Sequence, residues 1–147
     1  MNVLTIVAHP VPTSFNHAIR REVEAGLAEA GHEVKVADLY AERFQPAMIE
    51  ADFAQFTGDP LPIAIQAEQA RVEWSDAMIF IFPLWWWSMP AMMKGWIDRV
   101  MSYGFAWKDP RDPDSAGMRR RKIIVMITAG DDAAGLAKRG YDTALHT

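Results

Sequence analysis

Residues 83–100 read PLWWWSMPAMMKGWIDRV, and this stretch predicts the fold more directly than any other part of the chain. Residues 77–83, which lead into it, form a short and continuously apolar run, as in a strand buried on both faces of a parallel sheet. Pro90 can open a helix, and the apolar residues that follow recur at helical spacing. We therefore expect a buried strand, a tryptophan-rich loop and a helix in direct succession.

The three tryptophans of this loop have two interpretations. Successive side chains in a turning segment point in different directions, so Trp85, Trp86 and Trp87 cannot all face one core. At least one of them is then expected to line a pocket or an interface. The alternative is that they fill the seam between the following helix and the sheet.

The rest of the chain alternates strand and helix patterns. Further strands are expected at residues 3–8, 32–38 and 123–128, the second of them nearer the sheet edge. Helices are expected from Ser14 to Ala30, over 63–74 and from Pro90 to Val100. Between them lie an irregular excursion at 39–62 with a short helical turn and a loop at 103–117, and no convincing strand follows Thr128. Alternation of this kind predicts an α/β fold with a doubly wound parallel sheet and a single domain, residues 1–147.

The helical faces can also be predicted from spacing. In the first helix, residues that recur every fourth position form one apolar stripe: Phe15, Ile19, Val23 and Leu27. In the third, the expected apolar face contains Met92, Met93, Trp96, Ile97 and Val100. Lys94, Asp98 and Arg99 are expected elsewhere on that helix.

Composition excludes several classes of protein. The chain has 147 residues, a formal net charge of -4 and no cysteine, so neither a polyanion partner nor a disulfide, thiol nucleophile or zinc–thiolate site is indicated. We expect no metal site. No apolar run approaches the roughly 20 residues that span a bilayer. The first residues lack a charged leader, so a cytoplasmic protein is expected.

Ligands of open α/β sheets bind beyond the carboxyl ends of the strands. Residues 9–16, HPVPTSFN, place hydroxyl groups and a helix N-terminus there, a combination that favours an anion such as phosphate. Neither a Walker loop nor Gly-x-Gly-x-x-Gly is present. Thr13 or Ser14 could simply be a helix cap, and His9 a strand-end residue. Together with the tryptophan loop and Thr128-x-Gly130, however, the segment favours a planar aromatic ligand that carries phosphate, and flavin fits best.

Three motifs resemble one known family. They are AHPxPTSFN at residues 8–16, PLxWWxxPAMxKGW at 83–96 followed by Asp98-Arg99, and GFAW at 104–107. They resemble the NAD(P)H:quinone oxidoreductases, a flavodoxin-like group that includes quinone reductases, bacterial drug-activity modulators and the ancillary reductases of potassium-efflux systems. The resemblance runs in order through nearly the whole chain.

The resemblance implies a flavodoxin-like sheet of order 2-1-3-4-5, a bound FAD or alternatively FMN, NAD(P)H as co-substrate, and a homodimer with active sites at its interface. The residues that it implies for the flavin phosphate and ribityl chain are His9, Thr13, Ser14, Phe15 and Asn16. Those implied for the flavin ring are Pro83, Leu84, Trp85, Trp86 and Trp87, with Thr128 and Gly130 from the next loop. Gln55 would match a glutamine that contacts the pyrophosphate. Tyr141 would stand in for the tyrosine that stabilises charge during hydride transfer, with His146 a weaker match.

The chain departs from the family pattern in two places. Ala129 and Asp131 replace a threonine and a glycine of the loop after the fourth strand, and a carboxylate near the ring would oppose the anionic reduced flavin. The fifth strand and last helix of the family are missing, so the domain is expected to be truncated at its C-terminus relative to the family. The strand at 123–128 would then form an uncovered apolar edge.

The leading functional hypothesis is a flavin-dependent NAD(P)H oxidoreductase that passes a hydride through flavin N5 to a quinone or similar acceptor, with ping-pong kinetics. The alternative is a flavin-binding regulatory subunit that docks on a potassium-efflux transporter and has little turnover of its own. An electron-shuttle flavodoxin is disfavoured, because its strongly acidic surface and its Thr/Ser-rich phosphate loop are not found.

Overall fold

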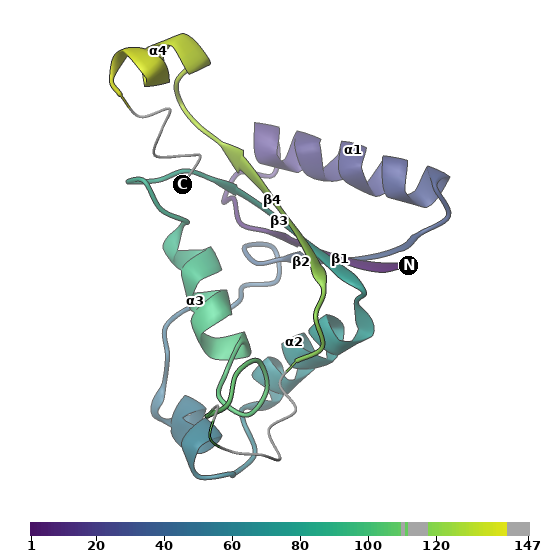
Figure 1. Ribbon diagram of the computed structural model, residues 1–147, viewed down its shortest axis with the longest axis vertical. Helices are drawn as coiled ribbons and strands as arrows, with labels where there is room; N and C mark the ends of the chain where they lie inside the picture. The colour runs from purple at the N-terminus through teal and green to yellow at the C-terminus, as the bar shows by residue number, and fades with distance from the viewer. Residues whose placement is uncertain (110, 112–117, 141–147) are drawn as a thin grey trace.

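The computed structural model describes residues 1–109, 111 and 118–140. Its strands form a parallel sheet in the order β2-β1-β3-β4 (Figure 1). Their bounds are β1 (Asn2–Val7), β2 (Glu33–Asp38), β3 (Ala77–Pro83) and β4 (Lys122–Thr128). The predicted order and the edge position of β2 are confirmed.

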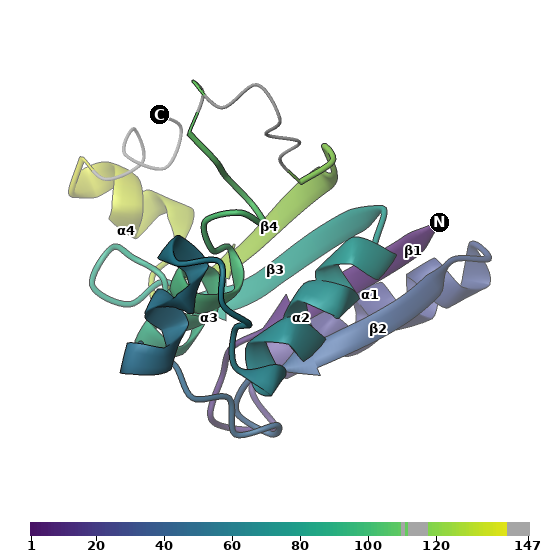
Figure 2. The same cartoon turned by 90° about the horizontal axis from the view of Figure 1, so that it is seen from below.

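Helices cover both faces of this sheet, as the view from below shows (Figure 2). The helices are α1 (Phe15–Glu29), α2 (Ile63–Trp74), α3 (Ala91–Val100) and the short α4 (Ala133–Lys138), with a 3-10 helix η1 (Glu50–Phe56). Strand side chains alternate between faces, so Leu4 and Ile6 pack beneath α2 and α3 while Val3 and Val7 pack beneath α1. The sheet is therefore doubly wound.

Helix α1 starts where its sequence predicts. Ser14 is the N-cap, and its hydroxyl accepts a hydrogen bond from the His17 backbone N–H at 3.4 Å. Ile19, Val23 and Leu27 pack on the sheet as predicted. Phe15 does not: it is 70% exposed, because it lies one turn before the part of the helix that meets the sheet. The predicted stripe is wrong at that residue.

The buried face of α3 is tied to the rest of the chain by polar contacts. Trp96 is fully buried, and its indole N–H donates to the Glu68 carboxylate on α2 at 2.9 Å. Arg99 makes a two-pronged contact with Asp52 of η1, at 2.8 and 2.9 Å. The expectation that Arg99 lies off the buried face is therefore wrong, because its charge is neutralised by a carboxylate carried by the irregular excursion.

Gly95 explains how closely that excursion approaches α3. A Cβ atom at Gly95 would lie 2.2 Å from the backbone oxygen of Pro46 and 2.6 Å from its Cα. Only a residue without a side chain allows this contact.

In the part of the chain that the structure describes, strand β4 lies at the second edge of the sheet and carries exposed apolar side chains. The residues concerned are 46% to 56% exposed: Ile123, Ile124, Val125 and Ile127. Within the described residues, no helix combines the length and apolar character that crossing a membrane requires.

Candidate functional site

The tryptophan loop is a tight turn at the carboxyl end of β3. Trp85 and Ser88 exchange two backbone hydrogen bonds, each 3.0 Å long, so Trp86 and Trp87 are the two central residues of the turn. Both have positive φ angles, 50° and 59°, as in the turns that suit hairpins. Asn and Gly normally take these positions, and a bulky residue there is strained.

This geometry holds the indoles away from the core. Trp86 is 98% exposed, and Trp85 and Trp87 are 42% and 49% exposed. The interpretation in which the three residues fill the seam beneath α3 is therefore wrong. Trp96 of α3 packs there instead, against Phe80 of β3.

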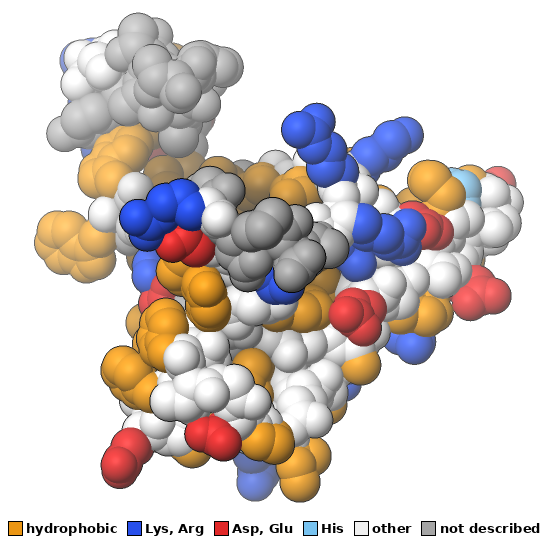
Figure 3. Space-filling model, turned by 60° about the horizontal axis from the view of Figure 1, so that its bottom comes forward, with side chains coloured by type: hydrophobic (Ala, Val, Ile, Leu, Met, Phe, Trp, Pro, Cys, Tyr) orange, Lys and Arg blue, Asp and Glu red, His pale blue; other side chains and the backbone are white. Residues whose placement is uncertain are grey.

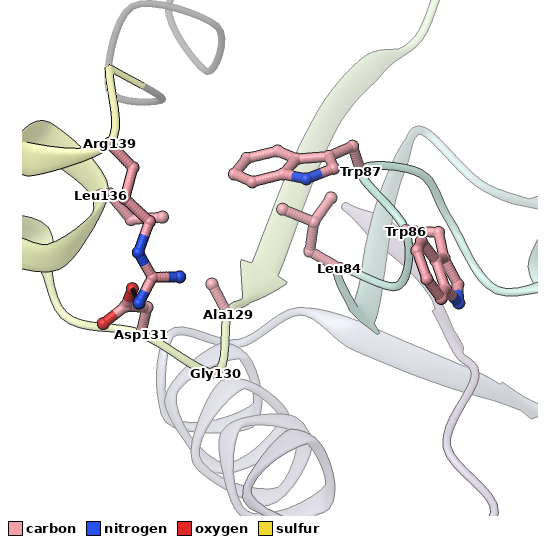
Figure 4. Close-up of a pocket in the computed structure, with 8 residues that line it drawn as sticks. All are labelled: Leu84, Trp86, Trp87, Ala129, Gly130, Asp131, Leu136 and Arg139. Carbon is pink, nitrogen blue, oxygen red and sulfur yellow. Dashed lines mark ion pairs between the residues drawn. The ribbon is translucent and has the colours of Figure 1, made fainter.

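A pocket of about 290 Å³ lies between this turn and the segment that follows β4 (Figure 4). In the figure, Trp87 lies across the opening from Leu136 and Arg139 of the α4 region. The residues that line the pocket are Leu84, Trp86, Trp87, Ala129, Gly130, Asp131, Leu136 and Arg139. The two loops that the sequence placed at the ends of adjacent strands thus meet around one cavity.

The loop between β1 and α1 lies at the same edge of the sheet. The His9 ring accepts a hydrogen bond from the Val11 N–H at 3.1 Å, and its centre lies 6.2 Å from that of Trp85. Thr13 is exposed, and the Ser14 hydroxyl serves as the helix cap. The first N–H groups of a helix have no partner within the helix, so this loop offers donors to an anion.

Asn16 in the first turn of α1 and Thr128 at the end of β4 connect the start of that helix to the sheet. Asn16 is 3% exposed, and its amide group and the Thr128 hydroxyl lie within 3.0 and 3.3 Å in a reciprocal hydrogen bond. Leu84 adds a second connection, since its backbone N–H donates to the Thr128 carbonyl at 2.8 Å. These contacts fix the loop after β1 against the loops after β3 and β4.

Gln55 does not line this pocket within a single chain. It belongs to η1, which lies beside the far end of α3 (Figure 1). Its side-chain oxygen accepts from the Tyr103 N–H at 2.8 Å, and its amide nitrogen donates to the Asp52 carbonyl at 3.0 Å. Tyr141 and His146 lie outside the described residues.

The pocket also contains residues that the sequence did not reveal. Helix α4 was not anticipated, and with it Leu136 and Arg139 were missed. A signal for it does exist: Asp132 caps α4 by accepting from the Gly135 N–H at 2.7 Å, and Gly140 follows the helix with a φ of 72°. The helix has only six residues, too few for a clear periodic pattern.

Asp131, which the sequence flagged as an added negative charge, has a partner. Arg139 lies 3.0 Å from one carboxylate oxygen, and the other accepts from the Asp132 N–H at 3.0 Å. The charge next to the pocket is therefore neutralised by a neighbouring cation. Among the described residues, no cluster of three or more potential metal ligands occurs.

The comparisons with known proteins agree with this architecture. A family model described as a flavodoxin-like fold matches residues 1–147. The ribosyldihydronicotinamide dehydrogenase-like protein traD of Penicillium crustosum is 41% identical, over 95% of this chain and 61% of its own length. The NAD(P)H:quinone oxidoreductase of Methanothermobacter marburgensis superposes with a TM-score of 0.85 at 33% identity, over 99% of this chain and 75% of that one.

A second similar structure contains a flavin. General stress protein 14 of Treponema denticola, solved in complex with FMN, has a TM-score of 0.64 and 26% identity, over 91% of this chain and 65% of that one. The chain thus spans about three fifths to three quarters of the length of these relatives. With its matching sheet order, loop motifs and family model, the chain belongs to the flavodoxin-like family that includes the NAD(P)H:quinone oxidoreductases.

Proposed function

We propose that this chain binds a flavin at the carboxyl edge of its sheet and catalyses two-electron transfer from NAD(P)H to a quinone. The pocket between the tryptophan turn and the loop after β4 is the observation that carries the proposal. FAD is the preferred cofactor and FMN the alternative. The transporter-subunit alternative has no support in the relatives described above.

The residues at this edge fit a flavin. Leu84 and Trp87 provide an apolar wall for a planar ring, and residues 129–131 form the opposite rim. The start of α1, with the exposed Thr13 hydroxyl, suits a phosphate. When bound, the flavin supplies the hydride chemistry, and the protein supplies binding and orientation.

Asn16 and Thr128 have a different role from the one implied by the family resemblance. Their side chains bond to each other, so we assign them to positioning: they hold the phosphate-binding loop at a fixed distance from the loop beside the ring. His9 has a similar role, since its ring accepts a hydrogen bond from its own loop. Pro83 and Trp85 hold the turn that presents Trp86 and Trp87.

The acceptor and the nicotinamide would use the same open side of the pocket in turn, which predicts ping-pong kinetics. Tyr141 stays the proposed charge-stabilising residue. Tyr141→Phe is then expected to lower kcat by about 10-fold or more, since positioned acid–base groups contribute roughly 10²–10⁴-fold.

A homodimer is part of the proposal, and one surface supports it. Hydrophobic side chains lie at the surface on the side of the molecule that carries η1 (Figure 3). Phe53, Phe56 and Trp107 are 53% to 57% exposed and border one hollow with Met48. Gln55 lines the same hollow, so any contact of Gln55 with a flavin would be to the flavin of a second protomer.

Flavin released by denaturation and NAD(P)H-dependent reduction of menadione test the proposal together. Trp87→Ala is expected to lower flavin occupancy, because it removes the wall of the pocket. Trp74→Ala is the matched control, because Trp74 ends α2 and contacts Lys35, away from the pocket. A protein that binds neither FAD nor FMN under any loading condition would contradict the proposal.

A further inference from the structure

The ion pair between Asp131 and Arg139 places two charged side chains at the pocket that the flavin proposal does not use. The carboxylate and the guanidinium of this pair are 3.0 Å apart, and both residues line the pocket. Figure 4 shows the guanidinium group of Arg139 beside the Asp131 carboxylate, at the side of the opening that faces Trp87. Their exposures differ, at 28% for the Asp131 side chain and 63% for that of Arg139.

Asp131 is engaged by its own loop. One carboxylate oxygen accepts from the Asp132 N–H, and the other faces Arg139. The carboxylate also packs against Gly135, where a Cβ atom would lie 2.3 Å from one oxygen and 2.7 Å from the other. Asp131 is thus held in place by the start of α4, and through its ion pair it fixes the position of Arg139.

Arg139 has N–H donors left to bind a ligand. A guanidinium carries five N–H donors in a rigid fork, and in the described part of the chain Asp131 engages one terminal nitrogen. The other side chains that line the pocket are apolar, among them Leu84, Trp87 and Leu136. The polar side chain best placed to meet a ligand is therefore the Arg139 cation, across the opening from the Trp87 indole.

We propose that Arg139 makes this pocket selective for planar aromatic ligands that carry negative charge, and that Asp131 acts through Arg139 as a positioning residue. The inference rests on the proposed function for the identity of the natural ligands. Two sources supply this chemistry: an acceptor with a carboxylate or sulfonate group beside its ring, and the flavin ring when reduction makes it anionic. An arginine beside either would form a charge-assisted hydrogen bond with the anionic oxygen.

The experiment uses four variants of the full chain, which are loaded with flavin for the measurement of its midpoint potential. Arg139→Gln removes the charge, Arg139→Lys keeps it, and Asp131→Asn removes the partner that positions it. Lys138→Gln is the matched control, because Lys138 is the preceding residue on α4, carries the same charge and does not line the pocket.

The first measurement is binding of naphthalene-2-sulfonate, which cannot be reduced, compared with its neutral analogue 2-naphthol. Because Arg139 is largely exposed, its contact is screened by water, and we expect Arg139→Gln to weaken sulfonate binding about three- to tenfold with 2-naphthol unchanged. Arg139→Lys should restore part of the loss, and Asp131→Asn should change binding in the same direction by a smaller factor. The second measurement is the midpoint potential of the bound flavin, which Arg139→Gln should lower if the ring is the anionic ligand.

If Arg139→Gln weakens only sulfonate binding, Arg139 contacts the anionic acceptor. If it lowers only the midpoint potential, Arg139 contacts the reduced flavin. If it does both, Arg139 contacts the two ligands in turn. The inference is overturned if Arg139→Gln behaves as Lys138→Gln in both measurements, or if it weakens the sulfonate and 2-naphthol equally. Sulfonate binding needs neither turnover nor bound flavin, so it can be measured even where the proposed oxidoreductase function fails.

Discussion

The two halves of residues 83–100 lie in opposite environments, although Trp87 and Trp96 are only nine positions apart in the sequence. In the first half, Trp86 and Trp87 take strained backbone conformations and are held toward solvent. In the second half, Trp96 and Arg99 are buried, and each has a carboxylate partner. The comparison shows one motif that combines a strained, exposed turn at residues 85–88 with a buried support, helix α3, and each prediction below tests one half or a partner of that half.

The largest change in stability is expected from the buried ion pair of helix α3. Arg99→Met leaves the Asp52 carboxylate, 1% exposed, without its cation, and we expect a loss of about 3–5 kcal/mol in the free energy of unfolding. Urea denaturation measures it. Lys94→Met, at an exposed pair on the same helix, is the control and should change stability by less than about 1 kcal/mol. Adding Asp52→Leu to Arg99→Met should recover part of the loss, and no recovery would mean that the buried charge is not the cause.

Gly95→Ala tests the close approach of α3 to the excursion. The new methyl group would overlap the Pro46 backbone, so we expect a loss of about 1–3 kcal/mol, the usual range for overpacking. Thermal unfolding measures the change. Gly26→Ala on α1, where an added Cβ meets nothing within 4 Å, is the matched control and should be neutral or slightly stabilising. Equal effects at the two glycines would contradict the packing argument.

Substitutions in the tryptophan turn are expected to raise the stability of the fold, whereas those in α3 lower it. Replacing Trp86 by Asn and Trp87 by Gly gives the turn its preferred residues, and we expect a gain of about 1–2 kcal/mol in stability together with weaker flavin binding. Equilibrium unfolding and flavin titration measure the two effects. Trp86→Ala separates them, because it removes the indole but retains the backbone strain. A double variant that loses stability would show that the indoles support the fold.

The smallest effect is the pH dependence of stability that comes from Glu68, the carboxyl partner of Trp96 on α3. Burial raises the pKa of the Glu68 carboxyl, against the opposing effects of the Trp96 N–H and Arg71. A raised pKa favours the protonated form in the folded state, so this contribution to stability is fully present below pH about 4.5 and is lost as the pH rises through the raised pKa. Unfolding of the wild type and Glu68→Gln across this range should show the wild type losing stability relative to the variant. A difference that does not vary with pH would contradict the assignment.

Most of the fold could be predicted from the sequence because it depends on local patterns. Apolar runs located β1, β3 and β4, alternation of apolar and charged residues located β2, and capping residues such as Ser14 located helix starts. The buried state of Arg99 could not be predicted, because its partner Asp52 lies 47 residues away in a segment without periodicity. Phe15 was misplaced for a related reason: spacing defines a helical face but not where the sheet beneath it ends.

The site was predicted in part. The edge of the sheet, the tryptophan loop and the loop after β4 were identified from position and residue type, and the structure brings Leu84, Trp86, Trp87 and Gly130 to one pocket. The reciprocal bond of Asn16 with Thr128 could not be read from the sequence, since 112 residues separate the two. Arg139 was missed because the helix before it is too short to show a period.

The bond between Asn16 and Thr128 has a consequence for how the protein would open. Among the described residues, Thr128 ends a strand that pairs only with β3, and strands at a sheet edge are among the first parts to detach in local unfolding. Detachment of β4 would remove the loop beside the flavin ring and release Asn16. Flavin binding would then be coupled to the docking of β4 on β3. A flavin that binds only the docked state stabilises it by mass action, and hydrogen exchange in β4 should slow as flavin concentration rises.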